Sequence, residues 1–159
     1  MKPSKLKKGH SSRLKEIRLQ DPIIFVTTCT HDRRQVLACE DLQEICLEVW
    51  HNAEKLYGWV VGRYVLMPDH VHFFCGNVQD EHSLSTFVGK WKEWTAKYSH
   101  RRHDLVPPLW QTEFFDHLLR SSESYDQKWQ YVLENPVRAG LVRQVNDWPY
   151  QGEIHKLLF

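Results

Sequence analysis

Residues 59–76, WVVGRYVLMPDHVHFFCG, contain two apolar runs rich in Val, Phe and Tyr, separated by a Pro-Asp pair. Such residues are typical of β-strands, and a Pro-Asp pair favours a tight turn. The stretch therefore predicts two neighbouring antiparallel strands over 59–67 and 70–76.

The flanking sequence predicts five further elements and an overall order β-α-β-β-α-β-α. They are a strand over 23–30, a helix over 40–56 that Gly58 ends, a helix over 83–102, a strand within 109–120, and a helix that opens at Ser121, is ended or bent at Pro136 and closes near Gly140. This order predicts an α+β fold of the ferredoxin-like or RRM-like kind, an antiparallel sheet with helices packed on one face.

Composition is that of an ordinary globular domain. The chain has 159 residues, 42% hydrophobic and 26% charged, so it can bury a core without disulfides. No apolar run approaches the roughly 20 residues that span a bilayer, and no stretch of signal-peptide type follows the first residues. We expect a bacterial cytoplasmic or nucleoid protein whose four cysteines are free, mostly buried thiols.

Charge is unevenly distributed. Residues 1–20 contain seven Lys or Arg against Glu16 alone, although the whole chain carries a formal net charge of +1. We therefore divide the chain into a basic arm over 1–20 and a single domain over 21–159. Such an arm is typical of phosphate-backbone binding, and a solvated tail explains it about as well.

His70-Val71-His72 lies within the second strand of the predicted hairpin. Because strand side chains alternate between faces, both imidazoles point the same way, about 7 Å apart. Two neutral imidazoles at this spacing can share a divalent metal, although paired surface histidines are more common.

The segment YVLENP (131–136) supplies a second candidate set. Tyr131 and Asn135 are four residues apart and would share one face of a helix. Beside a metal, the amide oxygen could be a third ligand and the phenol a nucleophile. Alone, the pair is better explained by a core tyrosine and an asparagine that helps to end the helix before Pro136.

Taken together, MPDHVHFF and YVLENPVRAGLV resemble the REP-associated tyrosine transposases of the HUH nuclease superfamily, which are related to single-tyrosine insertion-sequence transposases. LWQTEFFDHLLR (109–120) resembles that family's W-Q-x-x-F-x-D-H-x-x-R segment, and FVTTCTHDRR resembles its first strand and turn. The resemblance runs from about residue 20 to 150.

The resemblance implies a metal-dependent endonuclease and strand transferase that acts on single-stranded DNA at palindromic hairpins. His70, His72 and Asn135 would hold Mg²⁺ or Mn²⁺, and Tyr131 would form a 5′-phosphotyrosine and release a 3′-hydroxyl. It also favours a monomer, while exchange of the tyrosine helix within a dimer remains an alternative.

Further DNA contacts are expected from polar and basic residues outside the two motifs. Asp116 and His117 are candidates to orient a metal ligand, and Arg120 is a candidate phosphate clamp. The candidate phosphate-binding residues are Arg33, Arg34, Lys90, Lys92, Lys97, Arg101 and Arg102, most of them in a helix where Trp and basic residues alternate. An amphipathic helix with a basic solvated side explains that helix equally well.

Two other functions remain open. A non-catalytic module derived from a transposase could bind hairpin or single-stranded nucleic acid through an aromatic sheet, although it would not need all four residues of the two motifs. A zinc hydrolase could use His70, His72 and His117, but it would leave Tyr131 without a role.

Overall fold

The hairpin predicted over 59–76 forms and lies in the middle of the protein. In the computed structural model, which describes residues 13–159, β3 (Trp59–Leu66) and β4 (His70–Asn77) pair in antiparallel register. The backbone N–H of Met67 donates to the carbonyl oxygen of His70 at 2.8 Å and closes the turn.

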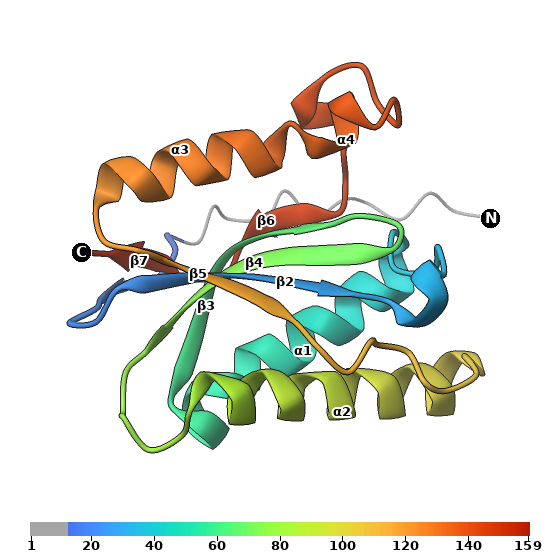
Figure 1. The fold of residues 1–159 in the computed structure, drawn as a ribbon, viewed down its shortest axis with the longest axis horizontal. Coiled ribbons are helices and arrows are strands. Elements are labelled where there is room, and N and C mark those ends of the chain that lie inside the picture. The colour runs from blue at the N-terminus through green and yellow to red at the C-terminus, as the bar shows by residue number, and fades with distance from the viewer. Residues whose placement is uncertain (1–12) are drawn as a thin grey trace.

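β4 is the central strand of a five-stranded antiparallel sheet with the order β5-β2-β4-β3-β6 (Figure 1). The other strands of this sheet are β2 (Ile23–Cys29), β5 (Phe115–Leu119) and β6 (Gln151–Glu153). The strands predicted at 23–30 and within 109–120 are thus confirmed, whereas β6 was not predicted.

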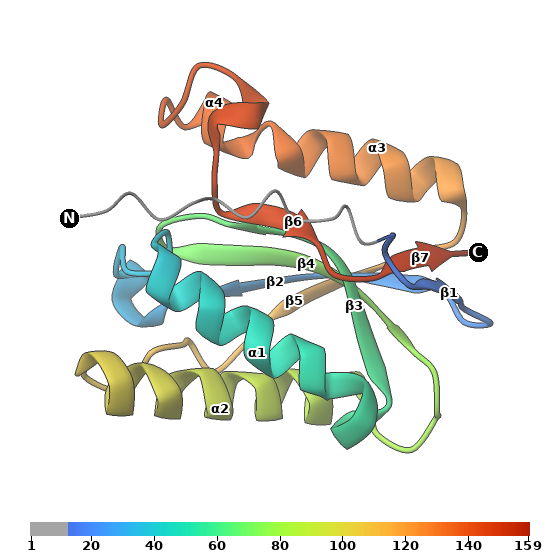
Figure 2. The same ribbon diagram turned by 180° about the vertical axis from the view of Figure 1, so that it is seen from behind.

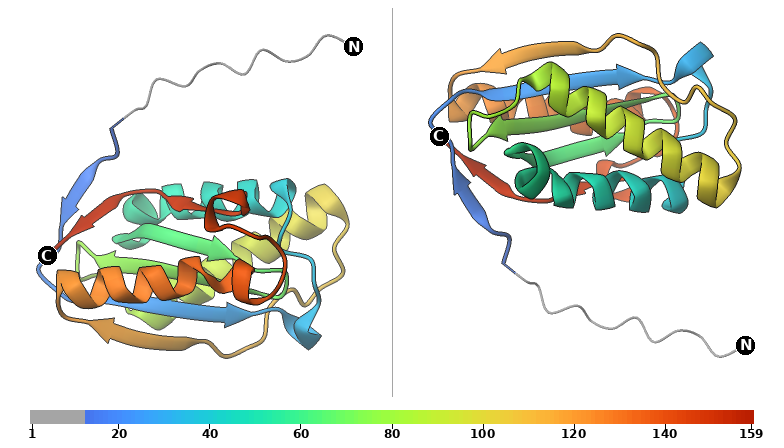
Figure 3. Two further views of the ribbon diagram at one scale, coloured as in Figure 1. Left: turned by 90° about the horizontal axis from the view of Figure 1, so that it is seen from above. Right: turned by 90° about the horizontal axis from the view of Figure 1, so that it is seen from below.

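Helices cover both faces of the sheet rather than one. The helical elements are η1 (His31–Arg33), α1 (Glu40–Tyr57), α2 (Leu84–His103), α3 (Ser122–Leu133), α4 (Asn135–Arg138) and η2 (Val145–Asp147). α1 and α2 pack on one face and α3 on the other (Figures 1 and 3). The prediction that all helices share one face is therefore wrong, because β3 and β4 are apolar on both of their sides.

Two neighbouring residues of β4 show why both faces need cover. Phe73 and Phe74 are both fully buried, yet they belong to separate apolar clusters. Phe73 packs with Trp50 and Trp91 beneath α1 and α2, whereas Phe74 packs with Tyr125 beneath α3. An almost continuous apolar run is typical of a strand that is buried on both sides.

The described part of the predicted basic arm packs against the domain. β1 (Glu16–Arg18) pairs in parallel with β7 (Lys156–Leu158) near the other end of the chain (Figure 2). Ile17 and Leu19 are buried in the cluster beneath α3, so the folded unit begins before residue 21. Residues 1–12 of the predicted arm lie outside the described residues.

Helix ends follow their local sequence. Gly58 ends α1 in the left-handed conformation, with φ of 71°, and Ser121 caps α3 through a reciprocal pair of bonds with Ser124. α3 ends at Leu133, and α4 places Pro136 in its first turn, because proline lacks an N–H and blocks the preceding turn. The helix predicted to continue towards Gly140 is thus divided. None of the helices in residues 13–159 is long and apolar enough to cross a bilayer.

Candidate functional site

His70 and His72 lie on the central strand and face the side of the sheet that α3 covers. Their ring centroids are 4.8 Å apart, with the rings nearly perpendicular. Cross-strand pairing places His72 opposite Thr27 and His70 opposite Cys29. The prediction that both imidazoles share one face is confirmed.

Asp69 fixes the orientation of His70. The Nδ1 atom of His70 lies 2.8 Å from Oδ1 of Asp69, and the Nε atom of Arg33 donates to Oδ2 of the same carboxylate at 2.9 Å. Burial would raise the pKa of Asp69, but the hydrogen bond from His70 and the nearby charges outweigh it and hold that pKa below its ordinary value. Since a carboxylate only accepts, neutral His70 carries its proton on Nδ1 and keeps the Nε2 lone pair free.

His72 is held by a hydroxyl and an aromatic ring. Its Nδ1 atom lies 2.7 Å from Oγ1 of Thr27, and its ring stacks on Phe25 with centroids 5.2 Å apart. Burial, followed by the charges of His70, Lys128 and Arg138, lowers the pKa of His72 to about 3. The imidazole is therefore neutral at pH 7, the form that binds a metal.

α3 carries Tyr131 and a cation to the same face of the sheet. The Nζ atom of Lys128 lies 4.8 Å from the Phe25 ring centroid and 5.7 Å from that of Tyr131. Phe25 in turn stacks on His72, so one lysine links the tyrosine to the histidine pair. The Tyr131 side chain is 60% exposed and accessible to a large ligand.

Arg138 connects Tyr131 to Asn135. Its guanidinium lies 4.1 Å from the Tyr131 ring centroid, donates to the Tyr131 carbonyl oxygen at 2.7 Å, and donates to the side-chain oxygen of Asn135. The carboxylate of Glu134 lies 3.6 Å from the same guanidinium. Asn135 thus holds its amide oxygen against an arginine rather than leaving it free.

Tyr131 and Asn135 do not share one continuous helix as predicted. Tyr131 belongs to α3 and Asn135 begins α4, with Glu134 as the single residue between the two helices. The predicted i, i+4 alignment is therefore replaced by a joint that Arg138 holds together.

The three residues predicted to support the site are scattered along β5. Asp116 pairs with Val26 and points to the face opposite the histidines, so it cannot orient them. His117 pairs with Phe25 on the histidine face and is exposed. Arg120 follows the far end of β5, beyond the pairing of Leu119 with Ile23.

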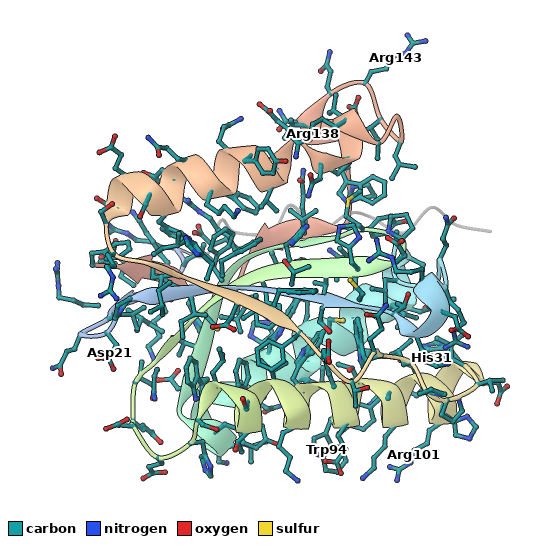
Figure 4. All side chains as sticks on the ribbon, viewed as in Figure 1. Asp21, His31, Trp94, Arg101, Arg138 and Arg143 are labelled. Carbon is teal, nitrogen blue, oxygen red and sulfur yellow. The ribbon has the colours of Figure 1, made fainter. Side chains whose placement is uncertain are left out.

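Most basic residues predicted for DNA contact lie on α2, on the other side of the sheet (Figure 4). Lys90 and Lys97 both pair with Glu93, and Arg102 pairs with Glu48. Arg101 is exposed on the same helix.

Lys92, by contrast, holds a loop in place. It donates to the carbonyl oxygens of Gln111 and Glu113 at 2.8 Å each, and burial lowers its pKa to about 8 although Cys29 opposes the shift. Arg34 donates to the carbonyl oxygen of Pro108 at 3.3 Å.

The zinc hydrolase expected as an alternative loses support, and so does the other tyrosine of α3 as a nucleophile. Within residues 13–159, no three His, Cys, Asp or Glu side chains are grouped to hold a metal ion, which argues against a zinc centre that includes His117. Tyr125, the other tyrosine of α3, is buried against Phe74 and cannot present its hydroxyl to a ligand. The four cysteines are free, and three of them are buried, as predicted.

Sequence reasoning missed the groups that orient the histidines. Asp69 could have been found because it directly precedes His70, at a turn that fixes its direction. Thr27 and Phe25 required the register between β2 and β4, which a single sequence does not reveal. Arg138 lies within the quoted YVLENPVRAGLV segment, but its role depends on the break at Pro136.

Comparison with known proteins shows which family the sequence matches. The family described as "Transposase IS200 like" matches residues 21–135, which include both histidines, Tyr131 and Asn135. The REP-associated tyrosine transposase of Escherichia coli K12 is 28% identical over 90 residues, which cover 57% of this chain and about half (52%) of that protein. A Haemophilus influenzae relative is 26% identical over 139 residues, 82% of this chain and 78% of its own length.

A solved structure shares the fold. It is that of a REP-associated tyrosine transposase bound to a REP hairpin, with a TM-score of 0.68, 21% identity, and coverage of 88% of this chain and 81% of that chain. The family match extends over most of the sequence and contains the histidine pair and the tyrosine that the fold brings to one face. The chain therefore belongs to the IS200-like transposase family.

Proposed function

We propose that this protein is a metal-dependent endonuclease and strand transferase that acts on single-stranded DNA beside palindromic hairpins, through a covalent 5′-phosphotyrosine at Tyr131. One observation carries the proposal. The Nδ1 atoms of His70 and His72 are both engaged, on the face of the sheet that the tyrosine-bearing helix covers.

The residues present fit a divalent metal in part. His70 and His72 are oriented by Asp69 and Thr27 through their Nδ1 atoms, the usual way in which proteins direct Nε2 towards a metal. Asn135 fits only if its amide oxygen leaves Arg138. When bound, Mg²⁺ or Mn²⁺ would polarise the scissile phosphate and stabilise the departing oxygen.

Tyr131 would supply the nucleophile. Its hydroxyl oxygen attacks the phosphorus of a phosphodiester, the bond from phosphorus to the 3′ oxygen breaks, and the phenol loses its proton while the 3′ oxygen gains one. The 5′ end of the cut strand is then linked to Tyr131, and the 3′-hydroxyl is free to reverse the step or to attack another such link. Lys128 and Arg138 flank the phenol ring and would attract the phosphate.

The substrate class is proposed from the relatives. The Escherichia coli relative is a REP-associated tyrosine transposase, and the fold is shared with such a protein bound to a REP hairpin. We extend hairpin DNA to this chain as its substrate and expect it to act as a monomer.

A denaturing gel tests the mechanism. The full chain is incubated with DNA stem-loops that carry single-stranded flanks, in Mn²⁺, Mg²⁺ or EDTA, and protein-linked DNA is sought. We expect a metal-dependent adduct that Tyr131→Phe abolishes without loss of DNA binding. The matched control is Tyr125→Phe, in the same helix but buried, which should keep the adduct.

Two results of the gel would contradict the proposal. Tight binding without an adduct, over several flank sequences and with both metals, would identify a non-catalytic binding module. An adduct that survives Tyr131→Phe would assign the nucleophile to another residue.

A further inference from the structure

We propose that Phe115 is a stacking platform for one unpaired base of the DNA, close to the phosphate that Tyr131 attacks. This inference rests on the proposed function and adds a binding position to it. Phe115 is the first residue of β5 and is 68% exposed; among the Phe, Tyr and Trp side chains of the described residues, only Tyr131, at 60%, is comparably exposed.

Register places Phe115 beside the histidine pair. It lies directly opposite Thr27 of β2, and Thr27 lies opposite His72 of β4. Paired residues point to the same face, so these three side chains form one row across the sheet. Two strand spacings separate the backbone of Phe115 from that of His72, about 10 Å.

α3 leaves this part of the face open. Phe25 and Leu119 point to the same face as Phe115 but belong to the apolar cluster beneath α3, and they are only 8% and 4% exposed. Phe115 lies outside that cluster. β5 is the edge strand, and α3 lies over the inner strands (Figure 3, left). The Phe115 ring is thus accessible from the side on which a strand of DNA would approach Tyr131.

Charge decides which ligand fits the ring. Lys128 contacts Phe25, the neighbour of Thr27 on this face, and Lys128 and Arg138 both lie over the Tyr131 ring. Asp116, the acidic residue next to Phe115, points to the other face. An exposed aromatic ring beside fixed positive charges suits a polyanion with flat apolar groups, as single-stranded DNA is.

Resemblance to the transposases does not account for this side chain. In the W-Q-x-x-F-x-D-H-x-x-R segment, Phe114 occupies the specified aromatic position and packs against the core. Phe115 occupies the next, unspecified position. The pattern therefore assigns no role to Phe115.

Fluorescence of 2-aminopurine tests the inference. DNA stem-loops carry this base at successive flank positions and are bound, with Mn²⁺, to the full chain with Tyr131→Phe, which prevents cleavage. We expect quenching at one or two adjacent positions that Phe115→Ala abolishes and Phe115→Trp retains. The affinity should fall about tenfold with Phe115→Ala.

The control is Leu118→Ala, on the same strand but on the opposite face and 44% exposed, which should change neither signal. Quenching that is unaffected by Phe115→Ala, or equally affected by Leu118→Ala, would overturn the inference. So would a Phe115-dependent dimer in sedimentation with unchanged DNA binding, because the ring would then contact a second copy.

The adduct gel separates this inference from the proposed function. An adduct without Phe115-dependent quenching would refute the stacking role alone. Phe115-dependent quenching without an adduct would support stacking and refute cleavage. Absence of binding to every stem-loop would overturn both.

Discussion

The two faces of the sheet differ in how far their positive charges are neutralised. On the α2 side, Lys97 and Arg102 lie over aromatic rings, but each also pairs with a carboxylate, that of Glu93 or Glu48. On the α3 side, Lys128 lies over the rings of Phe25 and Tyr131 and pairs with no carboxylate among the described residues, and Arg138 divides its contacts between the Tyr131 ring and Glu134. A basic residue therefore indicates a binding surface only through what its charge faces.

The two faces also differ in which side chains they bury. Beneath α1 and α2, Trp50 and Trp91 stack in parallel with centroids 5.3 Å apart, in a mainly apolar layer whose buried polar side chains are small hydroxyls such as Thr95 and Ser99. Beneath α3, two histidines replace apolar residues, and each needs a polar partner because an unpaired buried polar group is costly. The face beneath α1 and α2 mainly stabilises the fold, whereas the face beneath α3 contains polar groups that lower stability and supply the proposed site.

Arg138 offers the sharpest test of this contrast. Arg138→Ala removes the charged hydrogen bond to the Tyr131 carbonyl oxygen, worth about 1.5–3 kcal/mol, and the positive charge beside the phenol ring, so adduct formation should slow about a hundredfold. Single-turnover rates measure the effect. Arg143→Ala provides the control, since Arg143 follows α4 and is exposed (Figure 4), and it should stay within about twofold. Equal effects of both variants would show that Arg138 contributes charge alone.

Asp69 should matter next. Asp69→Asn removes the carboxylate that accepts from His70, and loss of such a partner typically weakens metal binding about 10- to 100-fold. Titration calorimetry with Mn²⁺ measures this without DNA. Asp126→Asn is the matched control, because Asp126 accepts from Arg63 at 3.0 Å away from the histidines. Unchanged Mn²⁺ affinity in Asp69→Asn would remove Asp69 from the site.

The same variant has a pH signature. Because the folded state holds the pKa of Asp69 below its ordinary value of 3.8, the carboxylate stabilises the fold above that pH, and the gain is lost as pH falls through the lowered pKa. The difference in free energy of unfolding between the wild type and Asp69→Asn should be constant from about pH 7 to 5 and shrink in more acidic solution. Urea denaturation at several pH values measures it.

The smallest effect is expected on α2. Replacing Lys90 and Lys97 by Ala removes exposed pairs with Glu93, which contribute about 0–1 kcal/mol. Affinity for the stem-loops should change by less than about twofold at moderate salt. A large loss with a reduced salt dependence would instead show that DNA also contacts this face.

Local chemistry made much of the fold predictable. Pro68-Asp69 specified the central hairpin, Gly58 ended a helix, and Ser121 began another. The strand at Glu16–Arg18 was not predicted. Ile17 and Leu19 alternate as in a strand, but the many basic residues around them led to their assignment to a charged arm. The parallel pairing of β1 with β7 joins residues about 140 positions apart, which no local pattern specifies.

The site was predictable to a smaller extent. His70 and His72 followed from the two-residue period of a strand, and Tyr131 followed from its motif. Thr27, Phe25 and Lys128 depend on which strand and helix lie alongside, and those contacts are set by packing of the whole chain. Asp116 and His117 are neighbours on one strand, so their side chains point to opposite faces and only one of them can face the histidine pair. That residue is His117.

The single-residue joint between α3 and α4 has a consequence for tolerated changes in length. Each residue of a helix turns the chain by about 100°, so one insertion or deletion at Glu134 would rotate Asn135 away from Tyr131 and detach Arg138 from both. Substitutions at Glu134 leave this geometry intact. We therefore expect homologues with an intact site to vary in residue type at this joint, but not in the number of residues between the tyrosine and the proline.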